Sequence, residues 1–202
     1  DPVRARVHAR HHLITAVSGT AAQSSRRRGE LALLAHAGFQ ELSTAQSRLR
    51  QLAERIGHTS EATLRDGLAL AADPDSALSL LIRLADVEEA GLGELDSFAW
   101  QRLCRIVGAS PALGEFLIRH PDVIERLTGR DGRLPSANEA RLELVDSVTG
   151  PEGVYSGETG WNALRVRYRE LLAGIALYDL TFDGSHADLL DARSAFEAVA
   201  AA

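Results

Sequence analysis

The chain has 202 residues, of which 45% are apolar and 25% are charged, and this balance excludes an intrinsically disordered chain. All 22 basic residues are arginine, and against 28 acidic residues they leave a formal net charge of −6, which disfavours general binding to nucleic acids or to anionic membranes. The length is that of one domain, or of one domain with an appended arm.

The single cysteine and the hydropathy pattern indicate the compartment. Cys104 is the only cysteine in the sequence, so an intramolecular disulfide is excluded, as expected in a reducing cytosol. No apolar run approaches the roughly 20 residues of a membrane-spanning helix, and the apolar run at 13–17 is too short for a secretory signal. We therefore expect a cytoplasmic protein that does not bind membranes. The sequence contains no methionine and begins at Asp1, which predicts that it is a piece of a longer protein.

Residues 1–29 differ in composition from the rest and are predicted to form an N-terminal arm that is flexible or weakly helical. His8 and His12 have the spacing of a two-histidine metal clamp on a helix, but no carboxylate or cysteine accompanies them or His11. The run from Arg26 to Arg28 has the charge to bind phosphate or an acidic partner. For both groups a solvated arm is the favoured interpretation, and no metal site is predicted.

From residue 30 onward, apolar residues recur at spacings of three and four, the period of an amphipathic helix. Gly38 is predicted to interrupt the first helical stretch, and Gly57 to end the second in a left-handed conformation. Asp73-Pro74 is a strong helix start, because aspartate caps the first turn and proline lacks the N–H that would be unpaired there. The helix after it is predicted to run to Gly91.

The second half of the sequence contains the same kinds of helix start and stop signals. Ser110-Pro111 repeats the cap-and-proline signal, and the glycine-rich stretch 149–160 is predicted to be loop. The other predicted helices cover residues 63–71, 111–120, 123–127, 137–148, 161–180 and 187–202, and one more, capped by Asp96 or Ser97, ends at Gly108. No alternating pattern of useful length predicts a β-strand. The expected fold class is therefore all-α, an antiparallel, bundle-like array of helices with short loops.

Several residues of catalytic types have a structural explanation. Cys104 lies in an apolar stripe, where a free cysteine behaves as a small hydrophobic residue. Two-metal nucleotidyl transfer needs a close pair of carboxylates, and the candidates are Asp73 with Asp75 and Asp188 with Asp191. Both pairs fit helix caps better. The sequence therefore assigns no catalytic, cofactor-binding or metal-binding residue.

An arginine pair on the predicted helix 161–180 is the candidate for a binding surface. Arg165 and Arg169 lie one turn apart on one side of this helix, a spacing that suits a phosphate or a partner's carboxylate. Arg167 is also expected to face mostly outward. The favoured interpretation is nevertheless that these arginines pair with the chain's own acids, such as Glu158 or Glu170.

Two blocks of sequence resemble the bifunctional glutamine synthetase adenylyltransferase/adenylyl-removing enzymes. The block from Gly108 to Pro121, GASPALGEFLIRHP, resembles a signature near the start of that family. The block from Ala163 to Leu180, with its LRVRYR, IA and DL, is similar to a long helix of the family. The DPD of residues 73–75 and the ADLLDA of residues 187–192 resemble family segments in the same order. The resemblance runs from residue 31 to the C-terminus, and the composition is similar to that of the actinobacterial branch.

The resemblance implies a place in a larger enzyme. Members of this family carry two nucleotidyltransferase-like domains, each with a Gly-Ser-Asp-x-Asp metal motif; one attaches AMP from ATP to glutamine synthetase, and the other removes it by phosphorolysis. By this resemblance, residues 30–202 are the helical N-terminal part of the adenylyl-removing half, and the chain ends before the first metal motif. Mg²⁺ or Mn²⁺ and ATP are the implied cofactors of the full-length protein, and glutamine synthetase and a PII-type regulator its implied partners. The chain itself is expected to be an inactive scaffold without a cofactor.

The sequence also departs from the family pattern. Tyr178 and Glu170 stand where the family commonly has arginine, which weakens a phosphate-binding role for the long helix. Gly174 inside this helix costs about 1 kcal/mol relative to alanine, which predicts a close packing contact there. The competing hypothesis is a free-standing helical interaction or regulatory module whose face from Arg165 to Arg169 binds an acidic partner.

Overall fold

The computed structural model describes residues 23–57, 59–129, 134–150, 153–155, 157–181 and 186–201. Within these ranges the secondary structure is helical apart from one short antiparallel strand pair. The expected all-α fold class and array of helices are therefore confirmed. His8, His11 and His12 lie outside the described residues.

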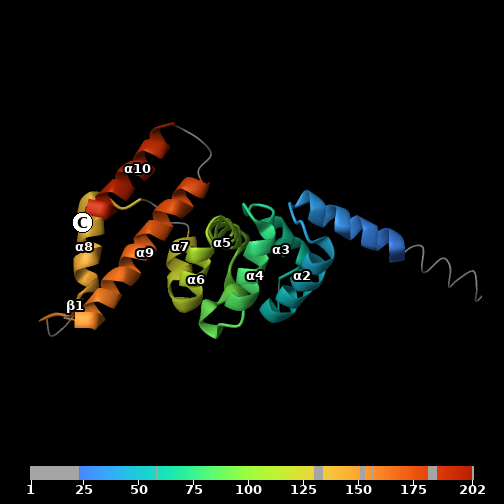
Figure 1. Ribbon diagram of the computed structural model, residues 1–202, viewed down its shortest axis with the longest axis horizontal. Helices are drawn as coiled ribbons and strands as arrows, with labels where there is room; N and C mark the ends of the chain where they lie inside the picture. The colour runs from blue at the N-terminus through green and yellow to red at the C-terminus, as the bar shows by residue number, and fades with distance from the viewer. Residues whose placement is uncertain are drawn as a thin grey trace, which may run out of the picture.

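The first part of the chain forms a row of helices (Figure 1). Residues 23–36 are helical, and this helix runs across the boundary expected between residues 29 and 30. The helices that follow are α2 (Leu42–Ile56), α3 (Glu61–Leu68), α4 (Pro74–Leu84), α5 (Ser97–Ala109), α6 (Pro111–Arg119) and α7 (Val123–Thr128). Alternate helices pack on one another, α2 with α4, α3 with α5 and α4 with α6, so that each is held by a helix two places along the chain.

The last part of the chain is a unit of three helices and a hairpin. Its elements are α8 (Ala137–Ser147), β1 (Thr149–Gly150), β2 (Gly153–Val154), α9 (Gly157–Thr181) and α10 (His186–Ala201). The long helix α9 packs on α8 and α10 and also on α5 and α7 of the row (Figure 1). Within the described ranges, no helix combines the length and the apolar character that crossing a bilayer requires.

Helix starts follow the cap signals in the sequence. The Oδ1 atom of Asp73 accepts a hydrogen bond from the backbone N–H of Ser76 (3.0 Å), and a proline begins α4. The hydroxyl of Ser110 accepts from the backbone N–H of Leu113 (3.4 Å), and a proline begins α6. Both cap-and-proline predictions are confirmed, because each depends only on neighbours within one turn.

Removing the cap of α4 gives a first testable prediction. The change Asp73→Ala leaves the N–H of Ser76 without its acceptor and is expected to lower the free energy of unfolding by about 1 kcal/mol. Urea denaturation measures the effect. The matched control is Asp122→Ala, since Asp122 precedes α7 without making a capping hydrogen bond and its exposed pair with Arg126 contributes little. An equal loss in both variants would contradict the capping role.

The helix predicted to run to Gly91 ends earlier, so that prediction was wrong. The helix α4 ends at Leu84, and two 3₁₀ turns flank Gly91, η1 (Glu88–Ala90) and η2 (Leu92–Glu94). Gly91 has a φ of 56°, in the left-handed region that other residues avoid. The turns bring a buried apolar residue from each side of this glycine to the core, which a straight helix would not do.

The stretch 149–160 is not a loop throughout, which corrects another prediction. β1 and β2 pair antiparallel, with Thr149 opposite Val154, and α9 begins at Gly157. A Cβ on Gly160 would lie 2.4 Å from the backbone oxygen of Tyr155, so the end of the hairpin packs directly on the first turn of α9. Gly160, one of the glycines that indicated a loop, thus serves close backbone approach, whereas Gly153 and Gly157 supply positive φ angles.

Glycines have two further roles in the fold. Gly38 and Gly57 have φ values of 90° and 82° and follow helices, as predicted. Gly108 is a position of close helix contact, because a Cβ there would lie 2.4 Å from the Cβ of Ala71. Gly174 is not such a position: its Cβ would meet only the Leu127 side chain, at 3.8 Å, so the close packing predicted for it was wrong.

The helix α9 is buried on two opposite sides. The larger core cluster belongs to the row of helices and includes Ala173 and Leu177 of α9. The smaller cluster joins α8, α9 and α10 and includes Leu171 and Ile175. Residues two apart on a helix point in nearly opposite directions, so α9 is the wall shared by both clusters.

Candidate functional site

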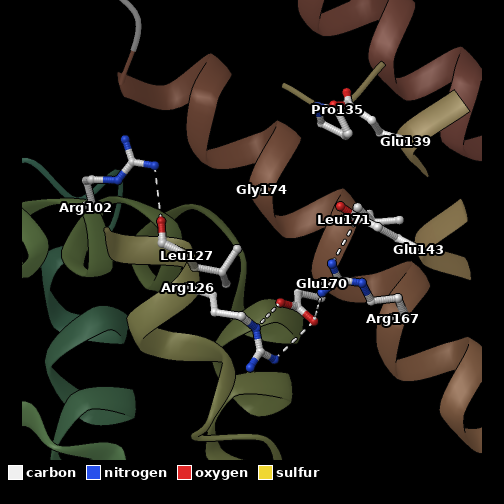
Figure 2. Close-up of a pocket in the computed structure, with 10 residues that line it drawn as sticks. All are labelled: Arg102, Arg126, Leu127, Pro135, Glu139, Glu143, Arg167, Glu170, Leu171 and Gly174. Atoms are coloured by element: carbon white, nitrogen blue, oxygen red, sulfur yellow. Dashed lines mark hydrogen bonds and ion pairs between the residues drawn. The ribbon is translucent and has the colours of Figure 1, made fainter. Parts of the chain in front are cut away.

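A pocket of about 240 Å³ lies where the two core clusters meet, between α5, α7, α8 and α9 (Figure 2). We refer to it as the junction pocket. Its lining comprises Arg102, Arg126, Leu127, Pro135, Glu139, Glu143, Arg167, Glu170, Leu171 and Gly174. Three arginines and three glutamates therefore line a space between two apolar cores, with Glu170 buried and Arg126 half-exposed.

Glu170 is at the centre of this charged lining and is only 6% exposed. Its Oε1 atom accepts a hydrogen bond from Nε of Arg126 (2.6 Å), and its Oε2 atom lies 2.6 Å from Nη1 of Arg167. Nη2 of Arg167 donates in turn to Oε2 of Glu143 (2.7 Å). Figure 2 shows how these side chains converge. The carboxylate of Glu170 thus connects α7 to α9, and Arg167 extends the connection to α8.

The electrostatics keep Glu170 ionised. Burial alone would raise the pKa of this carboxyl group, but hydrogen bonds from Arg126 and Arg167 outweigh burial and hold the pKa below its ordinary value. Hydrogen bonding to Glu170 also raises the pKa of Arg126. Because both carboxylate oxygens are occupied, Glu170 is suited to holding helices together rather than to transferring protons.

Two arginines of α5 interact with the ends of other helices. Arg102 is 9% exposed, and its Nη2 atom donates to the backbone oxygen of Leu127 near the end of α7 (3.1 Å). Burial lowers the pKa of Arg102. Arg105 donates through Nη1 to the backbone oxygen of Leu180 near the end of α9 (2.9 Å). Cations are favourable at helix C-termini, where carbonyl groups lack partners. Both arginines therefore fasten neighbouring helices to α5.

The structure separates the three arginines that the sequence grouped on α9. Arg165 and Arg169 are exposed, as predicted. Arg167 is half-buried and paired with Glu143 and Glu170, so its predicted outward position was wrong. The predicted pairing of these arginines with the chain's own acids is confirmed for Arg167, which binds Glu170, but no such pair is found for Arg165 or Arg169 among the described residues. Arg165 donates only to the Oδ1 atom of Asn162 (3.3 Å), and Arg169 has no hydrogen bond or ion pair to any described residue.

The other candidate residues have structural positions where they are described. Cys104 is buried in the larger cluster, and burial raises the pKa of its thiol, which disfavours the nucleophilic thiolate. Asp75 accepts a hydrogen bond at Oδ2 from the backbone N–H of Gln40 (2.8 Å) and so ties the start of α4 to the preceding helices. Arg26 to Arg28 are exposed on the helix that includes residues 23–36. The side chains of Asp188 and Asp191 lie outside the described residues.

The described residues do not fit a divalent cation site. Nowhere in the described ranges do three or more histidine, cysteine, aspartate or glutamate side chains form a group that would hold a metal. The carboxylates of Asp73 and Asp75 accept hydrogen bonds from backbone N–H groups. Glu170 is enclosed by two guanidinium groups.

Sequence reasoning missed Glu170 and Arg102 as buried charges. One signal was available for Glu170: with Val166, Ala173 and Leu177 it shares one face of α9, and those three neighbours all pack on the larger cluster. Arg102 had no such signal, because its partner is a backbone oxygen 25 residues away that only the fold brings near.

Comparison with known proteins finds relatives of one kind. The chain is 37% identical over 188 residues to the bifunctional glutamine synthetase adenylyltransferase/adenylyl-removing enzyme of Leifsonia xyli, covering 88% of this chain and 17% of the relative. The enzymes of the same name from Mycobacterium bovis and Bifidobacterium longum subsp. infantis are 32% and 30% identical, over 67% and 73% of this chain. The resemblance expected from the sequence is therefore confirmed.

These matches cover only a small part of each relative. The chain spans only 14% to 17% of the length of these three enzymes. No family model matches the chain. No solved structure matches it either.

Proposed function

Because this chain is homologous to a segment of the bifunctional glutamine synthetase adenylyltransferase/adenylyl-removing enzymes, we propose that residues 30–202 are a helical scaffold in the adenylyl-removing half of such an enzyme. The whole protein would add AMP from ATP to glutamine synthetase, with Mg²⁺ or Mn²⁺, and remove it by phosphorolysis. It would act in the cytoplasm, under a PII-type regulator, to control nitrogen assimilation. The catalytic metal motifs would lie in other parts of that protein.

The observation that carries this proposal is that the family-like block from Gly108 to Pro121 serves helix capping and core packing. Gly108 allows α5 to approach Ala71, and Ser110 caps α6. Phe116 and Leu117 are fully buried in the larger cluster. The residues most similar to the family therefore stabilise packing, which supports a scaffold. Homology to much longer enzymes favours this proposal over a free-standing interaction module.

The proposal predicts that the chain alone does not catalyse the removal of AMP. Mixed with adenylylated glutamine synthetase, phosphate and Mg²⁺, the 202-residue chain is expected to release no ADP above the blank, because residues suited to a two-metal clamp are not among those described. A coupled ADP assay measures release. The full-length Leifsonia xyli relative serves as the positive control. Release of ADP by the chain alone would contradict the scaffold role.

A further inference from the structure

One face of α9 is only partly covered by the rest of the described fold: Leu164 and Tyr168 pack on the smaller cluster, whereas Trp161 and Arg165 stay exposed. Leu164 and Arg165 lie three and four residues after Trp161, and Tyr168 lies four and three residues after them, so all four are on the same side of the helix. This side is opposite the stripe that includes Glu170 and packs on the row of helices. Trp161 is 62% exposed, although a tryptophan side chain gains much from burial. We refer to this side, with Arg169 one turn beyond Arg165, as the Trp161 face.

A depression of about 340 Å³ lies beside Trp161. Its walls are apolar and come from three helices: Leu144 of α8, Leu164 and Tyr168 of α9, and Val199 of α10, with Arg165 at the rim. The volume is enough for one large apolar side chain. The Trp161 face therefore combines a hollow for an anchor residue with an aromatic ring beside it.

The two arginines of the Trp161 face form no ion pair with any residue that the structure describes. Arg165 has only one contact, to the amide oxygen of Asn162, and Arg169 has none among the described residues. The acid nearest in sequence, Glu170, is occupied on the opposite side by Arg126 and Arg167. On a chain of net charge −6, two adjacent arginines that pair with no described carboxylate are complementary to an acidic surface. Tryptophan, tyrosine and arginine are also the residues most enriched where binding energy concentrates.

We propose that the Trp161 face docks an acidic segment of glutamine synthetase, with one large apolar side chain in the depression and carboxylates on Arg165 and Arg169. The inference rests on the proposed function, which supplies the partner. The planar guanidinium groups, one turn apart, suit bidentate contacts with carboxylates. The apolar anchor supplies affinity, and the arginines select the acidic segment.

The test measures binding of the 202-residue chain to purified glutamine synthetase by biolayer interferometry. Trp161→Ala is expected to weaken binding about thirtyfold, as for the loss of a central anchor. The double change Arg165→Glu with Arg169→Glu is expected to weaken binding at least about tenfold and to reduce its dependence on salt. Circular dichroism and thermal unfolding verify that each variant keeps the wild-type fold.

A matched control carries the same change of charge elsewhere. Arg27→Glu with Arg28→Glu reverses two exposed arginines at the far end of the row of helices and is expected to alter affinity by less than about twofold (Figure 1). If both surface variants bind like the wild type, the docking inference is overturned while the scaffold proposal stands. Failure of the wild-type chain to bind glutamine synthetase would overturn the docking inference, whereas the scaffold proposal is tested separately by the release of ADP. Self-association in sedimentation velocity that Trp161→Ala abolishes would show a second copy on this face and refute the acidic segment.

Discussion

The variant Gly108→Ala is expected to unfold with a free energy about 2 kcal/mol lower than the wild type. The added Cβ would lie 2.4 Å from the Cβ of Ala71, 2.9 Å from its Cα and 3.2 Å from the backbone nitrogen of Ala72. Two of these atoms belong to the backbone, so the overlap is relieved only if α5 moves away from the chain that follows α3. Overpacking of this kind costs about 1–3 kcal/mol or more, and the better helix propensity of alanine recovers at most about 1 kcal/mol.

Thermal unfolding checks this prediction, with a fall in Tm of about 4–8 °C expected for a chain of this size. The matched control is Gly174→Ala, inside α9, where the new Cβ would meet only the Leu127 side chain at 3.8 Å. That variant should be as stable as the wild type or more stable by up to about 1 kcal/mol. If the two variants behave alike, α5 does not approach Ala71 as closely in solution as described.

The variant Glu170→Gln is expected to lose about 3 kcal/mol of stability at neutral pH. It removes the one negative charge that both Arg126 and Arg167 contact inside the junction pocket. A buried ion pair broken on one side leaves an uncompensated charge at a cost of about 3–5 kcal/mol. The lower end applies here, because Arg126 is half-exposed and keeps its pair with Asp122, and Arg167 keeps its pair with Glu143. Urea denaturation measures the loss, and Glu143→Gln, at the more exposed end of the network, should lose less than about 1 kcal/mol.

The same variant predicts a change in the pH dependence of stability. The folded-state pKa of Glu170 lies below the ordinary carboxyl value of 4.5, so its contribution is fully present above that value. The contribution is lost as the pH falls through the lowered folded-state pKa. The stability difference between wild type and Glu170→Gln should therefore be constant near neutrality and shrink in acid. A difference that stays the same down to pH 3 would show that the charge of Glu170 is not what stabilises the junction pocket.

The positions of the helix ends show where sequence reasoning worked. Asp73-Pro74 and Ser110-Pro111 predict helix starts correctly because a cap and its acceptor lie within one turn of each other. The glycine-rich stretch 149–160 was wrongly predicted to be loop throughout, because glycines that permit a loop also permit two backbone segments to approach closely. Whether Gly160 lies in a loop or in the first turn of α9 depends on the backbone of Tyr155, which packs against it.

The candidate surfaces were only partly predictable for a similar reason. The exposure of Arg165 and Arg169 follows from their place on an amphipathic helix. The burial of Glu170 does not, because the pattern of α9 was interpreted as having a single inner face. A helix buried on two sides has little amphipathic contrast, and which of its charges are enclosed depends on the helices that pack on each side.

The sequence by itself determined the helical class, the helix starts at Asp73-Pro74 and Ser110-Pro111, and the homology, since each depends on local spacing or on residue identity. The tertiary structure alone decided that α9 joins two cores, that Glu170 binds Arg126 across 44 residues, and that Trp161 stays outside. These outcomes depend on contacts between segments distant in the chain, and local periodicity carries no information about which distant segment will supply a partner.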